Sequence, residues 1–180
     1  MTRANVSSAD YRALVARQAT KAACPVKEGW ADGALTIFVP GTPRHFKGKG
    51  HRYTVSKHTK NWRERTASRL LPYWFNEGRG RGFWPWLPEL PKAITFTIYT
   101  AGRGFDPDNR RLICSPCLDA LGMPRRYLRK GPDGKMREVG GHGVGLIDDD
   151  KNPAHAISYE QVTKATVPGI AITVALKGAE

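Results

Sequence analysis

The sequence has few acidic residues, few cysteines and no long apolar run. It carries 16 Asp and Glu against 29 Lys and Arg in 180 residues, for a formal net charge of +13. No apolar run reaches the roughly 20 residues that span a bilayer. Residues 1–24 also lack the continuous apolar stretch of a signal peptide. We therefore expect a soluble, cytoplasmic protein.

The chain has three cysteines, Cys24, Cys114 and Cys117. This small, odd number does not favour a disulfide framework. The spacing of Cys114 and Cys117 is that of a redox or half-zinc motif. A zinc site needs four ligands, and no second cysteine pair exists. We expect free thiols that are buried as small apolar side chains.

The excess of cations indicates a polyanionic partner, because Lys and Arg that neutralise phosphates release bound counterions, and this release favours binding. Nucleic acid is the leading partner class, and a solvated basic surface is the alternative. The five histidines, at positions 45, 51, 58, 142 and 155, lack ligand or triad spacing. We assign them no role.

The length predicts one domain, residues 34–180, with an N-terminal helical extension over residues 1–33. The alternation of apolar and polar residues predicts strands over 34–39 and 92–100. A helix with Ser56 as its N-cap and an apolar stripe through Trp62, Thr66 and Leu70 should end at or kink near Pro72.

Residues 123–145 are predicted to form a basic insertion, a hairpin arm or mobile loop turning at 132–134. Residues 156–167 and 170–176 are expected to form a terminal hairpin. This order of elements predicts an α+β fold with a small mixed sheet packed with two helices.

Negative charge is concentrated in two short segments of this basic chain. Residues 105–119 and 148–150 hold six of the 16 acidic residues. Pro107 biases Asp106 toward extended backbone, on which positions i and i+2 share a face, so the carboxylates of Asp106 and Asp108 should project together. A hard cation removes their repulsion, and Mg²⁺ fits best, with Mn²⁺ as an alternative. Asp149 and Asp150 would supply further oxygens.

A structural explanation of the same residues stays open. Asp106, Asp108 and Asn109 can form an Asx turn that caps a helix, while residues 148–150 form a solvated turn. Pro116 indicates that this helix begins near Ser115. An EF-hand is excluded, because Arg111 stands where that loop needs glycine and Cys117 where it needs glutamate.

The motifs resemble the RusA family of Holliday-junction resolvases, and its phage-encoded members in particular. The resemblance lies in D-P-D-N at 106–109, D-A-L at 119–121 and the acidic triplet at 148–150. It covers residues 34–177 in element order. It implies a RusA-like α+β fold and a basic homodimer that cuts four-way DNA junctions with Mg²⁺. It also implies a cytoplasmic location in a bacterial or phage-infected host cell.

The resemblance carries over Asp106, Asp108 and Asp150 as the catalytic carboxylates, with Asp149 as a further metal ligand. The family has a lysine four residues before the aspartate matched by Asp119, where this chain has Ser115. Arg110, Arg111 or Lys151 would then have to stabilise phosphate charge.

Two further functions stay open beside the nuclease. One is a catalytically weak or inactive protein that binds branched DNA on the same scaffold. The other is RNA binding through basic aromatic stretches. For DNA binding we expect contacts from Arg44, Lys47, Lys49, Arg52, Lys57, Lys60, Arg63, Arg110, Arg111, Arg125, Arg126 and Lys151.

Overall fold

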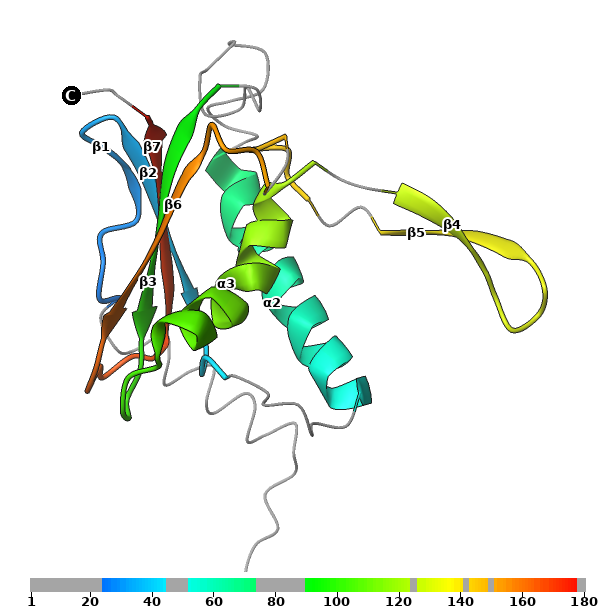
Figure 1. Cartoon of the computed structure of the whole chain (residues 1–180), viewed down its shortest axis with the longest axis horizontal. Coiled ribbons are helices and arrows are strands. Elements are labelled where there is room, and N and C mark those ends of the chain that lie inside the picture. The colour runs from blue at the N-terminus through cyan, green and yellow to red at the C-terminus, as the bar shows by residue number, and fades with distance from the viewer. Residues whose placement is uncertain are drawn as a thin grey trace, which may run out of the picture.

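The structure, a computed structural model, describes residues 24–44, 52–73, 90–123, 126–140, 143–148 and 151–177. Its main sheet has five strands in the order β1-β2-β7-β3-β6. These strands are β1 (Gly29–Ala31), β2 (Ala34–Pro40), β3 (Lys92–Tyr99), β6 (Ala156–Val162) and β7 (Gly169–Leu176). Both long helices, α2 (Arg52–Tyr73) and α3 (Pro107–Leu121), lie on one side of this sheet (Figure 1). The predicted α+β class is therefore confirmed.

The core lies between the helices and one face of the sheet. On β3 the alternation of apolar residues places Ile94, Phe96 and Ile98 on this face with no exposed surface. The predicted stripe of α2 packs opposite them, since Trp62 and Leu70 are at most 3% exposed. Burial of each such side chain contributes roughly 1.5–3 kcal/mol relative to an exposed position.

The connection between the last two strands differs from the predicted terminal hairpin, which was wrong. β7 lies between β2 and β3 and is antiparallel to both, whereas β6 is parallel to β3 on its other side. The link between β6 and β7 crosses the end of β3. There Thr100 N donates to Val162 O at 2.9 Å, and Ala165 N donates to Thr100 O at 3.0 Å.

The helix boundaries also correct two predictions. α2 begins at Arg52, so Ser56 lies inside the helix and is not its N-cap; the helix ends one residue after Pro72. α3 begins at Pro107 rather than near Ser115, and Pro116 lies within it. A proline inside a helix costs one backbone hydrogen bond. Here both neighbouring cysteines are buried in the core, and the helix continues to Leu121.

Residues 29–31 of the predicted N-terminal extension form an edge strand of the sheet. β1 pairs with β2 through a two-residue turn in which Asp32 and Gly33 both have positive φ, 50° and 71°. Just before this strand, Glu28 accepts a hydrogen bond from Phe38 N at 2.7 Å. The helix predicted upstream falls in residues 1–23, outside the described residues.

The predicted basic hairpin is present. Its strands β4 (Arg126–Lys130) and β5 (Met136–Gly140) are antiparallel and form a separate two-stranded sheet. This arm extends away from the main sheet and the helices (yellow in Figure 1). Leu128 and Met136 are largely exposed on it.

Candidate functional site

The two predicted aspartates of the D-x-D motif, Asp106 and Asp108, form an acidic turn at the N-terminus of α3. Asp106 is the N-cap, and its Oδ1 accepts a hydrogen bond from Asn109 N at 3.1 Å. Pro107 occupies the first helical turn, where its missing N–H costs nothing. Asp106 has extended backbone, as predicted, with φ of −64° and ψ of 160°, whereas Asp108 lies on the helix. The two residues therefore do not share a face of an extended segment, and that part of the prediction was wrong. The capping interpretation is confirmed for Asp106.

The capping role and a metal-binding role of Asp106 can be separated by mutation. Asp106→Ala removes the cap and should lower the free energy of unfolding by about 1 kcal/mol. Asp106→Ser keeps a capping oxygen but removes the charge, so its stability should stay near wild type. Urea denaturation checks both values. Equal stability of Ala and Ser variants would contradict the cap.

The acidic turn is anchored to the sheet at the far end of β6. Phe105 N donates to Gln161 Oε1 at 2.8 Å, and Arg110 Nε donates to Phe105 O at 3.0 Å. A Cβ at Gly104 would lie 2.1 Å from the Gln161 amide nitrogen, so a side chain there would displace the Gln161 amide that holds Phe105 N. Arg110, predicted to contact DNA, therefore holds the acidic turn in place.

The acidic run begins at the opposite end of α3. Leu146 N and Ile147 N both donate to Leu121 O, at 2.7 and 3.2 Å, and Ile147 forms a parallel bridge with Gly122. Leu146 and Ile147 are fully buried. Asp148 follows directly, so the core fixes the start of this run beside the helix C-terminus.

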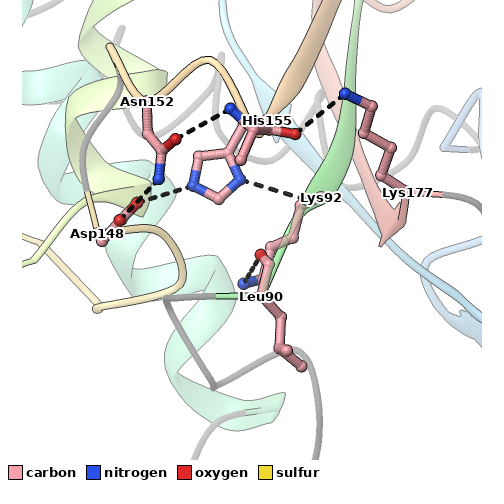
Figure 2. Close-up of polar contacts among 7 residues, drawn as sticks. Leu90, Lys92, Asp148, Asn152, His155 and Lys177 are labelled. Carbon is pink, nitrogen blue, oxygen red and sulfur yellow. Dashed lines mark hydrogen bonds and ion pairs between the residues drawn. The ribbon is translucent and has the colours of Figure 1, made fainter.

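Asp148 is held by Asn152 and His155, and we refer to these three residues as the Asp148 cluster (Figure 2). Asp148 Oδ2 accepts from Asn152 Nδ2 at 2.8 Å, and its Oδ1 lies 2.8 Å from His155 Nε2. The Asp148 side chain is 41% exposed, whereas that of His155 is fully buried. The cluster therefore presents an oriented carboxylate at the surface.

The proton of His155 is located by its second nitrogen. Lys92 N donates to His155 Nδ1 at 3.2 Å, so Nδ1 is the acceptor of the ring. In the neutral imidazole the hydrogen then resides on Nε2, which donates to Asp148. The first residue of β3 thereby sets the direction of the hydrogen bond that orients Asp148 (Figure 2).

Two lysines complete the surroundings of the cluster. Lys92 is fully buried and its Nζ donates to Leu90 O at 3.1 Å. Lys177 Nζ donates to Ala154 O at 3.3 Å, beside His155 (Figure 2). Sequence reasoning gave none of the histidines a role, so His155 was missed.

The acidic turn and the Asp148 cluster lie at opposite ends of α3. The helix rises about 1.5 Å per residue, which places Pro107 and Leu121 about 21 Å apart. The length of β6 gives a similar separation. His155 directly precedes this strand, and Gln161, which holds the acidic turn, lies about 17 Å from the first residue of the strand.

This separation bears on the predicted metal site. Among the described residues, no group of three or more His, Cys, Asp or Glu side chains is placed to hold a metal ion. Asp149 and Asp150 lie outside the described residues. The carboxylates that the structure describes within one chain thus do not bring three ligand side chains to one point.

Apart from Arg110, the predicted DNA-binding cations fall into three groups. Arg63 donates through Nε to Asp119 Oδ2 at 2.9 Å and forms an ion pair that joins α2 to α3. Lys60 lies 3.6 Å from Glu64. Arg44, Lys57, Arg111 and Lys151 are exposed. Outside the described residues, or without a described side chain, are Lys47, Lys49, Arg52, Arg125 and Arg126.

The two cysteines of α3 are structural. Cys114 and Cys117 are free thiols and fully buried, as predicted. Burial raises the pKa of the Cys117 thiol to about 12 and raises the pKa of Cys114 further. Neither side chain is a thiolate at neutral pH, so neither is a reactive nucleophile there.

Comparison of the chain with protein-family models, curated proteins and solved structures found no match in any of the three. Within the described ranges, neither α2 nor α3 is long and apolar enough to cross a membrane.

Proposed function

We propose that this chain is a structure-selective endonuclease that cuts four-way DNA junctions by paired phosphodiester hydrolysis. The Asp148 cluster carries the proposal. A buried histidine and an amide orient one partly exposed carboxylate directly before Asp149 and Asp150. Fixing a carboxylate in this way is typical of residues around metal and catalytic sites. The net charge of +13 supports a phosphate-rich substrate.

The proposed cofactor is Mg²⁺, with Mn²⁺ as a substitute, and the proposed ligands are Asp106, Asp108, Asp149 and Asp150. Oxygen ligands select these hard cations. Because the described carboxylates lie at two ends of α3, we place the complete ligand set across a homodimer. An antiparallel arrangement of two α3 helices about a two-fold axis brings each acidic turn to the partner's acidic run.

The test is cleavage of a synthetic four-way junction with Mg²⁺ by wild type and by Asp108→Asn. The substitution removes one negative charge at an exposed position and keeps the side-chain shape. We expect the cleavage rate to fall by about 100-fold or more. Glu160→Gln, which removes an exposed carboxylate from β6, is the control and should cut like wild type. An Asp108→Asn variant as fast as wild type would overturn the ligand assignment.

A second candidate is a protein that binds branched DNA without cutting it. The separation of roughly 20 Å between the acidic turn and the Asp148 cluster within one chain favours this candidate. So does Ser115, which is exposed on α3 where the resembled family has lysine. Tight junction binding with no incision in Mg²⁺ or Mn²⁺ would select this function. A preference for single-stranded RNA over four-way junctions would instead indicate the RNA-binding function that the sequence leaves open.

A further inference from the structure

A groove lies between α2 and the end of β2. Its volume is about 340 Å³, and Val39 and Pro40 line it on the strand side. The helix side is polar: Asn61, Glu64, Arg65, Ser68 and Arg69 line it. The sequence predictions did not single out this groove, and the proposed nuclease chemistry does not use it.

Arg65 is an exposed residue of α2 whose guanidinium lies over the Trp62 ring in this groove. Its Cζ lies 5.8 Å from the centroid of the Trp62 ring, which is itself 3% exposed and therefore fixed by the core. On the other side, a Cβ built on Gly41 would lie 2.7 Å from Arg65 Nη1. Gly41 has φ of 149°, which favours glycine, so the chain leaves room for the guanidinium.

The groove has a surplus of positive charge around Arg65. Among the described residues, no carboxylate lies within ion-pair distance of Arg65, whereas Arg69 lies 3.4 Å from Glu28 and Glu64 pairs with Lys60. Burial, and then the charge of Arg69, lower the pKa of Arg65. One anion between the two guanidiniums would relieve this repulsion.

The positive charge continues toward the N-terminus of α2. His58 lies two helical turns before Arg65, and its pKa is lowered by burial and then by the charge of Arg44. His58, Arg65 and Arg69 share one face of α2, and Arg44, which precedes the helix, lies close enough to His58 to act on its pKa. The lowered pKa leaves His58 neutral at pH 7, so the cations of this row are Arg44, Arg65 and Arg69. A row of cations along a groove is the arrangement that tracks a phosphate backbone.

We propose that this groove binds the phosphodiester backbone of DNA, with Arg65 as its central contact and Arg69 on the adjacent phosphate. The planar guanidinium of Arg65 can bind two phosphate oxygens at once. One turn of α2 separates the two arginines, about 5.4 Å along the axis, so both guanidiniums can contact the same DNA strand. The proposal rests on the nucleic-acid partner of the proposed function and not on cleavage.

The experiment measures the binding of a labelled DNA duplex to the full chain over a series of NaCl concentrations, in EDTA. Arg65→Gln removes one phosphate contact, so the log–log slope of affinity against salt should fall by about 0.9, with several-fold weaker binding. Arg65→Lys keeps the positive charge but loses the planar guanidinium that can bind two phosphate oxygens, and it should keep most of the salt dependence. Arg103→Gln removes an arginine from an exposed loop and is the matched control.

Each result decides between explanations. An unchanged slope in Arg65→Gln would overturn the proposal that the groove binds DNA. A lowered melting temperature in the same variant would then show that Arg65 only covers Trp62. Equal losses in the Arg65 and Arg103 variants would also overturn it, because net charge alone would then explain binding. If wild type binds no DNA, the groove and the proposed function both fail. If the Arg65 effect is found but no junction is cut, only the nuclease fails.

Discussion

Replacement of His155 by alanine is expected to lower the free energy of unfolding by about 3 kcal/mol. The imidazole is fully buried, and its Nδ1 accepts the hydrogen bond from Lys92 N. Without it, a buried N–H at the start of β3 loses its partner, which costs about 1–3 kcal/mol, and a cavity adds to the loss. Denaturant unfolding followed by fluorescence or circular dichroism measures the change.

Two conservative variants divide the roles of this histidine. The amide oxygen of Asn in His155→Asn can take the place of Nδ1, so this variant should recover part of the lost stability. The amide nitrogen of Gln in His155→Gln can take the place of Nε2 and should keep the hydrogen bond to Asp148. Cleavage should therefore survive better in the glutamine variant than in the asparagine variant.

His58→Ala provides the control for these variants. His58 is partly exposed on α2 and packs edge-on against Trp62, with ring centroids 6.1 Å apart. Loss of the His58 side chain should lower the free energy of unfolding by less than about 1 kcal/mol. If His155→Ala were no more destabilised than His58→Ala, the hydrogen bonds of the Asp148 cluster would not contribute to stability as argued.

The elements that the sequence predicts well are those whose pattern is local. Residues 34–39 and 92–100 alternate apolar and polar side chains, and each forms a strand of nearly the predicted length. The stripe at Trp62, Thr66 and Leu70 is buried for the same reason, because one face of a helix repeats every three to four residues. β1 was missed, although Asp32-Gly33 is a strong signal of a two-residue hairpin turn.

Strand order and the Asp148 cluster could not be read in the same way. The position of β7 between β2 and β3 depends on pairings across 70 residues or more, which no local pattern encodes. His155 likewise acquires its role from Lys92, which is 63 residues away. The cap at Asp106 was found because all its atoms lie within four residues.

The distance between the ends of α3 leads to the sharpest test of the homodimer. Mixing Asp108→Asn chains with Asp150→Asn chains should restore junction nicking that neither variant has alone. If each ligand set combines the acidic turn of one copy with the acidic run of its partner, a mixed dimer has one site with both substitutions and one intact site. The intact site can cut one strand only.

The product distinguishes this arrangement from a site within one chain. A mixed dimer with sites completed between subunits should yield nicked junctions and no resolved duplexes, because paired incision needs two active sites. If all ligands came from one chain, both sites of the mixed dimer would lack a carboxylate and no nick would form. Subunit exchange is checked by co-purification of differently tagged chains. Confirmed exchange without nicking would contradict the shared site, and it would require one chain to bridge the roughly 20 Å length of α3.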